Sequence, residues 1–454
     1  MGDYDFIVEG LYEGYWKFPM LENDILGTLS IEKGRMIFRI IFKGDNLSRW
    51  GQTLNIEGEA FNNKKNKFYF SLFNLKVMRC EDFDDSYHEF IFEVGNVYMK
   101  TEPNIDFNAI KRCVISTRFL DEWVWEYIKD SYSYDLTLHT NNKQNLKYKQ
   151  KSSYVCFKNE ETKIELYFGT RINYPSVNGF HIKNKCFLNI HFNVIKDFGA
   201  ASTFAERVLH LFSLLWNISY LPEYVEFRTI NNNKFVYIQN SNRIIINDNI
   251  FNSCVYTELS DFSKKEIFLI FEKWIKLYNK YPDALSMYFN SLLNAHLPND
   301  QNIKNMISII DGITERVTTN GISNDTRRKQ ELNNILNKCT ELSSEEKNKL
   351  RTWVLRENGT ELKPRFRDLL SQIEYLLPDD YITHSFSIGN DELVNRIVDI
   401  RNGLTHPKEA NENVSLSPIE YSKYATCLKK ILHIYLMHKV NIPDRVIEKV
   451  RDFI

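Results

Sequence analysis

The chain has 454 residues, with 58 Lys and Arg against 59 Asp and Glu and a formal net charge of −1. Its length predicts two or three domains and is sufficient for a large buried core. Hydrophobic residues make up 43% and charged residues 26%, which excludes a disordered or fibrous chain. Because the charge is balanced, any contact with nucleic acid must be local.

Several function classes are disfavoured by absent motifs. The sequence lacks GxxxxGK[ST], GxGxxG, GxSxG and HExxH, which argues against an NTPase, a dinucleotide enzyme, an α/β-hydrolase and a zinc protease. The seven cysteines are at least 30 residues apart, so neither a zinc site nor a disulfide framework is expected. No apolar run predicts a membrane span, and the N-terminus does not resemble a secretory signal. We expect a cytoplasmic protein that needs no metal or other cofactor.

The first half of the sequence predicts strands. β-Branched and aromatic runs at residues 25–30 and 35–43 flank Glu32-Lys33-Gly34, which is typical of a hairpin. Further strands are predicted at residues 67–75, 89–100, 164–168, 223–229 and 234–239. One helix is expected at residues 200–216, and its His210 is expected to be buried in the protein core. Residues 1–250 are therefore predicted to form an antiparallel, β-rich, sandwich-like region.

From about Asp261 the apolar spacing becomes helical. Ser417, Pro418 and Glu420 form a capping-box pattern at the start of the last long helix. Helices are predicted at residues 265–280, 302–317, 326–337, 344–356, 363–377, 391–402 and 417–439. We predict an α+β protein whose all-α domain covers residues 255–454, with the domain boundary near residues 240–260.

The segment Asp391–Pro407, DELVNRIVDIRNGLTHP, is the part of the sequence that indicates chemistry. At about 100° per residue, Arg401 falls inside the apolar stripe of this helix. The stripe consists of Leu393, Val394, Ile397, Val398 and Ile400. An Arg on a packed face is costly unless it is paired or serves a site.

Gly403 predicts a helix stop, after which the chain could fold His406 back towards Arg401. His can transfer a proton near neutral pH, and Arg can hold phosphate oxygens and stabilise charge on phosphorus. Neither role requires a metal. The alternative is structural, with Arg401 capping helix carbonyls and His406 in a surface turn.

Arg401-Asn402-Gly403-Leu404-Thr405-His406 resembles the RNxxxH form of the Arg-x4–6-His motif of HEPN ribonucleases. The whole chain resembles ApeA-like anti-phage defence proteins, in which a β-rich ApeA domain precedes a HEPN domain. The matching N-terminal patches are Gly14-Tyr15-Trp16-Lys17-Phe18-Pro19, Ile25-Leu26-Gly27-Thr28-Leu29, Ile56-Glu57-Gly58 and Phe119-Leu120-Asp121-Glu122-Trp123.

The resemblance implies a metal-independent endoribonuclease of the abortive-infection type, with Arg401 and His406 as catalytic residues. It also implies products with a 2′,3′-cyclic phosphate and a 5′-hydroxyl. Asn402 could orient the phosphate or His406, or cap the helix. Asp311 stands where the ApeA-like pattern has a Glu, and it could orient His406, pair with Arg401 or lie at a helix edge.

Basic residues could contact RNA, although each is also consistent with a solvated helix face. The candidates are Arg327, Arg328, Lys363, Arg365 and Arg367. The resemblance further implies a homodimer through the HEPN domain. The expected partners are RNA and a phage-derived trigger that acts on the β-rich half.

Two other readings of the sequence stay open. In one, the HEPN fold is catalytically inactive and binds a nucleotide or a protein, with the β-rich half as its recognition domain. In the other, aromatic strands form a carbohydrate-binding sandwich with a helical tail. The intact Arg401 and His406 favour the enzyme, because a binding module has no chemical need for the pair.

Overall fold

The structure is a computed structural model of the whole chain. It describes residues 10–18, 23–32, 35–43, 54–82, 87–128, 133–138, 144–149, 153–173, 181–217, 222, 224–239, 257–293, 299–314, 324–339, 342–347, 362–378, 380–405 and 416–452. Contacts divide the chain into two compact units. Unit 1 comprises Met1–Phe212 and Tyr220–Phe271, and unit 2 comprises Ser213–Ser219 and Glu272–Ile454.

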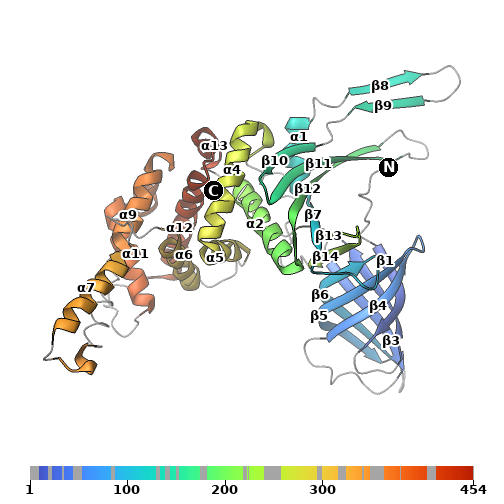
Figure 1. Cartoon of the computed structure of the whole chain (residues 1–454), viewed down its shortest axis with the longest axis horizontal. Coiled ribbons are helices and arrows are strands. Elements are labelled where there is room, and N and C mark those ends of the chain that lie inside the picture. Colours follow the sequence, from blue (N-terminus) through green and yellow to red (C-terminus); the bar gives the residue numbers. More distant parts are fainter. Residues whose placement is uncertain are drawn as a thin grey trace. The chain divides into compact units, whose positions relative to one another are not determined.

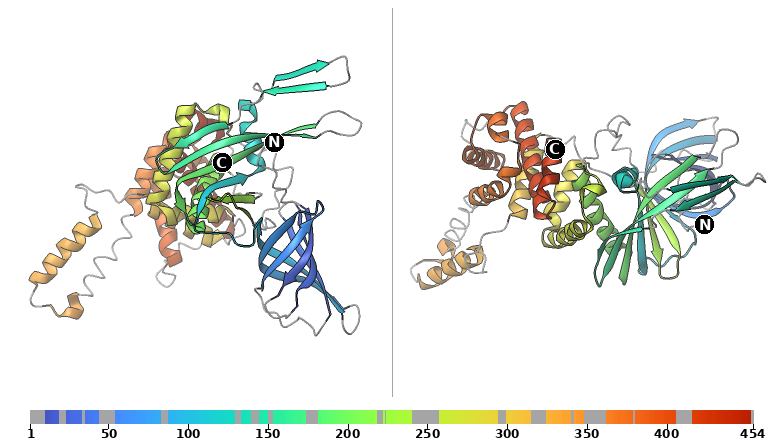
Figure 2. Two further views of the ribbon diagram at one scale, coloured as in Figure 1. Left: turned by 45° about the vertical axis from the view of Figure 1, so that its right-hand side comes forward. Right: turned by 90° about the horizontal axis from the view of Figure 1, so that it is seen from above.

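Unit 1 begins with a closed antiparallel barrel (Figures 1 and 2). Its strands follow the order β6-β3-β2-β1-β4-β5, and β5 pairs again with β6 to close the ring. These strands are β1 (Gly10–Lys17), β2 (Ile25–Glu32), β3 (Arg35–Lys43), β4 (Leu54–Asn62), β5 (Lys67–Asp82) and β6 (Tyr87–Lys100). The predicted antiparallel β-rich half is confirmed, but these strands form a barrel instead of stacked layers because both edges of β6 are paired within the ring.

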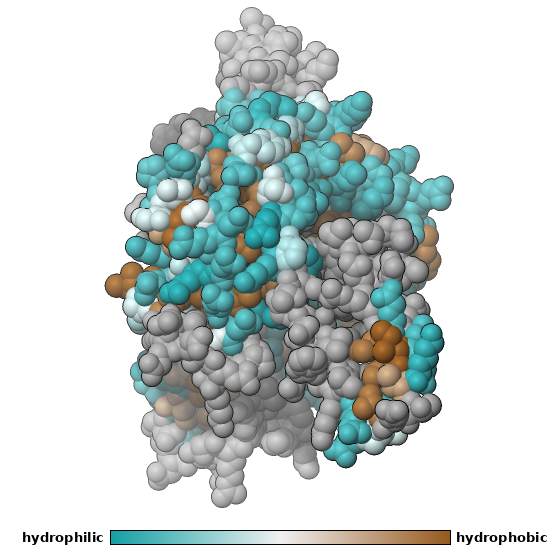
Figure 3. Space-filling model, turned by 90° about the vertical axis from the view of Figure 1, so that its left-hand side faces the viewer, coloured by the Kyte–Doolittle hydropathy of each residue, from teal (hydrophilic) through white to brown (hydrophobic). Residues whose placement is uncertain are grey.

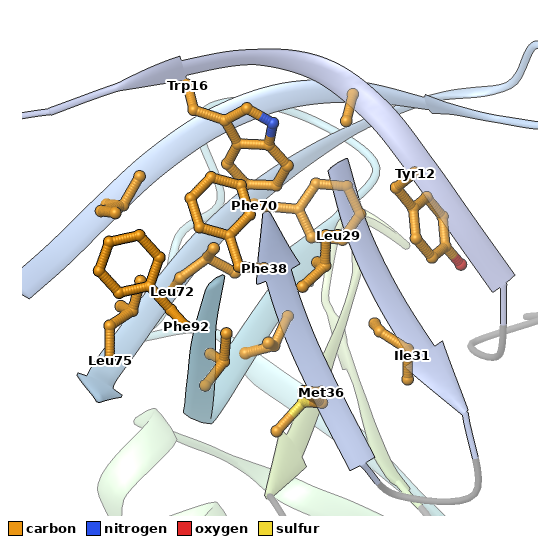
Figure 4. Close-up of a cluster of buried hydrophobic side chains, with 14 of the residues drawn as sticks. Tyr12, Trp16, Leu29, Ile31, Met36, Phe38, Phe70, Leu72, Leu75 and Phe92 are labelled. Atoms are coloured by element: carbon orange, nitrogen blue, oxygen red, sulfur yellow. The ribbon is translucent and has the colours of Figure 1, made fainter. Parts of the chain in front are cut away.

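The barrel interior is packed with aromatic and aliphatic side chains (Figure 4). Trp16 is fully buried, and its indole N–H donates to the carbonyl of Gly27 at 3.0 Å. Its ring lies against Gly58, where a Cβ would overlap the indole. Three of the N-terminal sequence patches therefore meet around one tryptophan, which explains the glycine at position 58.

The long strand β6 continues from the barrel into an open sheet. Its first half pairs with β3, and Asn96–Lys100 pair with β14 at the same edge. The open sheet runs β10-β11-β12-β7-β13-β14-β6. Its other strands are β7 (Ile110–Ser116), β10 (Ser153–Lys158), β11 (Thr162–Asn173), β12 (His181–Lys196), β13 (Tyr224–Thr229) and β14 (Lys234–Gln239), and a separate hairpin joins β8 (Ser133–Leu138) to β9 (Gln144–Lys149).

Helices α1 (Arg118–Ile128) and α2 (Phe198–Trp216) contact one face of the open sheet. Phe198 of α2 contacts the rings of Phe227 and Phe235, and Tyr127 of α1 contacts Phe168. The predicted helix at residues 200–216 is confirmed as α2, whereas α1 was not predicted. The opposite face of the sheet is mixed: charged side chains of several strands alternate there with buried apolar residues such as Val114 and Val236.

The remaining elements are helical, as predicted from about residue 261. They are η3 (Leu259–Asp261), α4 (Lys264–Lys280), α5 (Pro282–Leu293), α6 (Asn299–Ile313), α7 (Asn324–Lys338), α9 (Leu362–Ile373), η5 (Glu374–Leu376), α10 (Tyr381–Phe386), α11 (Asn390–Thr405), α12 (Pro418–Lys439) and α13 (Asp444–Val450). α12 packs against α6 and α9, and α11 packs against the same two helices. No helix in the described ranges is long and apolar enough to cross a membrane.

The capping box at α12 is confirmed: the Ser417 hydroxyl accepts from the Glu420 N–H at 3.3 Å, and the Glu420 carboxylate accepts from the Ser417 N–H at 2.8 Å.

The predicted helix at residues 344–356 lies mostly outside the described residues, and α5, α10 and α13 were not predicted. Among the residues that are coloured in Figure 3, most are hydrophilic, and the hydrophobic ones form small, separate groups.

Candidate active site

Helix α11 carries Arg401 as the sequence predicts. The five residues of its apolar stripe, Leu393, Val394, Ile397, Val398 and Ile400, are all buried. Arg401 is half-buried, while the next residue, Asn402, is exposed. Because α11 packs against α6 and α9, the backbone from which Arg401 projects is held in place.

The predicted helix stop at Gly403 is wrong. α11 continues through Gly403 to Thr405, so Asn402 is a helical residue and not the C-cap. A glycine inside a helix costs about 1 kcal/mol, and the burial of five apolar side chains outweighs that cost. His406 and the side chain of Thr405 lie outside the described residues. The approach of His406 to Arg401 therefore stays a prediction.

Asp311 and Arg365 were predicted as separate site residues, and the structure joins them in one ion pair between α6 and α9. The Arg365 side chain is 8% exposed, against 35% for Asp311. A second guanidinium nitrogen donates to the backbone carbonyl of Asp311 at 2.9 Å. The expectation that Arg365 lies on an exposed RNA-binding face is corrected, because its guanidinium is buried and binds residue 311 twice.

The other basic candidates differ in their surroundings. Arg367 is exposed on α9, and its Nε donates to the Asp391 carboxylate at the start of α11 at 2.6 Å. Lys363 is half-buried at the start of α9. Arg327 and Arg328 lie on α7, and their side chains are outside the described residues. Among these residues, Arg367 and Lys363 have the accessibility that contact with a phosphate requires.

A buried histidine that the sequence analysis did not select lies in the core of unit 2. His433 of α12 is 1% exposed. Its Nδ1 accepts from the Tyr288 hydroxyl at 2.9 Å, and its Nε2–H donates to the Leu214 carbonyl at 2.9 Å. Burial lowers the pKa of His433 to about 3. Its place in the apolar run ILHIYLM was the sequence signal that could have identified it.

These contacts predict acid sensitivity. His210 is also buried, and burial lowers its pKa to about 4. In the unfolded chain the pKa of each histidine is about 6.5. Below that pH the unfolded state therefore binds protons that the native state does not bind. The free energy of unfolding should fall as the pH decreases from about 6.5, by about 2 kcal/mol per histidine at pH 5. Urea unfolding at pH 7.5 and pH 5 measures this loss.

His433→Gln is the matched variant for that measurement. A glutamine amide can donate to the Leu214 carbonyl and accept from Tyr288, but it does not titrate. The variant should therefore lose less stability between the two pH values than the wild type. An unchanged loss would show that His433 does not contribute to the acid sensitivity.

A pocket of about 620 Å³ lies between α10 and the first turns of α12. Its lining residues are Tyr381, Ser385, Phe386, Pro418, Ile419, Ser422, Lys423, Thr426 and Cys427. Its walls combine aromatic and aliphatic groups with hydroxyls and a single lysine. Within the described part of the chain, no three His, Cys, Asp or Glu side chains are grouped so that they could hold a metal ion.

Comparison with known families agrees with this architecture. The family model described as ApeA N-terminal domain 1 matches residues 11–274, which is more than half of the chain. The model described as Apea-like HEPN matches residues 305–446, from α6 to α13. No curated protein and no solved structure matches the chain. HEPN domains are generally ribonucleases. The chain therefore belongs to the ApeA family, as an anti-phage defence protein that carries a C-terminal HEPN domain.

Proposed function

We propose that this protein is a metal-independent RNA endonuclease of the abortive-infection type, with Arg401 and His406 as its catalytic residues. The observation that supports this most strongly is the Apea-like HEPN match over residues 305–446, because that range contains an intact Arg401-Asn402-x3-His406 segment. The half-buried position of Arg401 on the packed side of α11 also supports it. A charged side chain with no other role would lie on the exposed side of the helix, in contact with water.

In the proposed reaction, the 2′-hydroxyl of the RNA attacks the adjacent phosphorus, and the 5′-oxygen of the next nucleotide leaves. His406 removes the proton of the attacking hydroxyl, or gives one to the leaving oxygen. Arg401 donates to the non-bridging oxygens and stabilises the charge that develops on them. The products carry a 2′,3′-cyclic phosphate and a 5′-hydroxyl.

The remaining candidates receive supporting roles in this proposal. The exposed Asn402 amide, one residue after Arg401, is available to orient the phosphate. Asp311 acts as a positioning residue, because its carboxylate is already paired with Arg365. RNA contacts are assigned to Lys363, Arg367, Arg327 and Arg328, and not to the buried Arg365.

We further propose that the protein acts in the cytoplasm as a homodimer through its HEPN domain, and that the β-rich half restrains the nuclease until a phage-derived trigger binds. A test by truncation at residue 255 would be flawed. Unit 2 includes Ser213–Ser219, and the Leu214 carbonyl is the acceptor for the buried His433. Regulation is better tested with substitutions in the full chain.

The chemistry predicts a specific pattern of RNA cleavage. Cleavage should persist in EDTA, because the nucleophile is a hydroxyl of the substrate and needs no metal-bound water. Cleavage should stop when the nucleotide 5′ of the scissile bond lacks its 2′-hydroxyl. A gel assay on an RNA that the protein cuts, and on the same RNA with one deoxynucleotide, measures both effects.

Two results would contradict this mechanism. Cleavage that requires Mg²⁺ would indicate that a metal ion generates the nucleophile or stabilises the leaving group. Cleavage of the single-deoxy substrate at the same bond would show that water, and not the 2′-hydroxyl, attacks phosphorus.

A further inference from the structure

The face of the open sheet that lies opposite α1 and α2 carries a row of basic residues. Six strands that are neighbours in the sheet (β10, β11, β12, β7, β13 and β14 in Figure 1) each contribute one residue to this row. Directly opposed Cα partners give its order, which is Lys158, Lys163, His191, Arg112, Arg228 and Lys234. Opposed residues of antiparallel strands point to the same face. We call this set the basic row.

The neighbouring row of the same face holds both acidic and apolar residues. It contains two carboxylates, Glu165 on β11 and Glu226 on β13. Glu226 pairs with the buried Arg228 within its own strand. Like charges that lie directly opposite each other destabilise a sheet. The five Lys and Arg side chains of the basic row outnumber these two carboxylates, so the two rows together carry more basic than acidic side chains.

Asn189 lies in the neighbouring row, directly opposite Glu165 on β11, and it precedes His191 on β12 by two residues. It is fully buried, and neither its amide nitrogen nor its amide oxygen has a hydrogen-bond partner. A buried polar group without a hydrogen-bond partner destabilises the folded state, so native structures contain few of them. A ligand group that donates one hydrogen bond and accepts another would satisfy this amide.

Glu165 lies beside the accessible end of the basic row and is an internal counter-ion there. Its carboxylate oxygens are 2.5 Å from Lys163 Nζ and 2.8 Å from His191 Nε2. The side chains of Lys163 and His191 are each 33% exposed, against 11% for Glu165. Solvent therefore reaches the two basic groups, and a second anion can compete with Glu165 for them.

We propose that this end of the open sheet binds a nucleotide. The phosphate replaces Glu165 as the partner of Lys163 and His191, with Lys158 at the rim, and the base edge pairs with the Asn189 amide. An Asn amide matches the adjacent acceptor and donor of adenine, N7 and N6. Because Arg228 and Glu226 at the centre of the row are buried and paired, the site fits a compact anion better than an extended strand.

The proposal concerns unit 1 and does not depend on the nuclease chemistry. It is tested by isothermal titration calorimetry on the full chain carrying His406→Ala, so that RNA cleavage does not enter the measurement. The probes are AMP, inorganic phosphate and adenosine. AMP should bind more tightly than phosphate, and adenosine should bind weakest, because only AMP engages both the basic groups and Asn189.

Three variants give different expected results. Lys163→Gln should weaken AMP binding several-fold, and Asn189→Leu should weaken it about tenfold while leaving phosphate binding unchanged. Glu165→Gln should tighten AMP binding, because the competing carboxylate is removed. Asn189→Leu also removes an unsatisfied buried group, so the fold should tolerate it.

Matched controls isolate the basic row from general charge effects. Glu161→Gln changes the same charge in the exposed β10–β11 turn, and Lys76→Gln removes an exposed lysine from the barrel strand β5. Neither should change AMP affinity by more than about twofold. The proposal is overturned if AMP does not bind, or if phosphate binds as tightly as AMP. It is also overturned if Glu165→Gln weakens AMP binding although this variant unfolds at the same urea concentration as the wild type.

Discussion

Replacing His406 with alanine should lower the rate of RNA cleavage by about a hundredfold or more, because the reaction loses its general acid–base group. Replacing Arg401 with alanine should cost a similar factor, because the charge that develops on the phosphate oxygens loses its donor. Arg401→Lys should recover little activity, since an ammonium cannot reproduce the two-pronged guanidinium. Single-turnover cleavage rates of a defined RNA measure all three losses.

The helical unit offers a control for each substitution. His384 of α10 is exposed, so His384→Ala removes an imidazole from the same unit without touching the proposed site. Arg396→Lys makes the same change as Arg401→Lys on α11, and residue 396 lies about 140° around the helix from residue 401. Both controls should cleave at the wild-type rate. If His384→Ala were as slow as His406→Ala, the loss would not identify His406 as catalytic.

The parts of the fold that were predictable are those with a local cause. The apolar period of α11 predicted five buried residues, and all five are buried, because a helix that packs on one side requires that spacing. The capping box at Ser417 was also predictable, since both of its hydrogen bonds join residues three apart. The hairpin of β13 and β14 has Asn232 at φ 61°, a conformation that asparagine tolerates.

The parts that were missed depend on distant residues. Barrel closure needs β5 to pair with β6 while β6 also pairs with β3, and no local pattern specifies both edges. The extension of α11 past Gly403 has a similar cause, because packing against α6 and α9 stabilises a helix that glycine weakens. The partner of Asp311 is 54 residues away, so a wheel of α6 alone could not show it.

Removing the Asp311 carboxylate should destabilise the protein by about 2–3 kcal/mol. In Asp311→Ala the buried Arg365 guanidinium loses this carboxylate and keeps its hydrogen bond to the backbone carbonyl of residue 311. The loss should lie near the lower end for broken buried pairs, because the Asp311 side chain is 35% exposed. Asp391→Ala is the control: it removes an acid that pairs with Arg367 of the same helix, and both of those side chains are more than half exposed. It should cost less than about 1 kcal/mol.

The double variant Asp311→Ala, Arg365→Met separates a positioning role from a catalytic one. Replacing both partners of a buried ion pair with uncharged residues is often close to neutral, so urea unfolding should show much of the lost stability restored. If Asp311 only ties α9 to α6, the double variant should also cleave RNA at nearly the wild-type rate. If stability returns but cleavage stays slow by a hundredfold, Asp311 takes part in the chemistry beside Arg401 and His406, and its pairing with Arg365 must be exchanged when RNA binds.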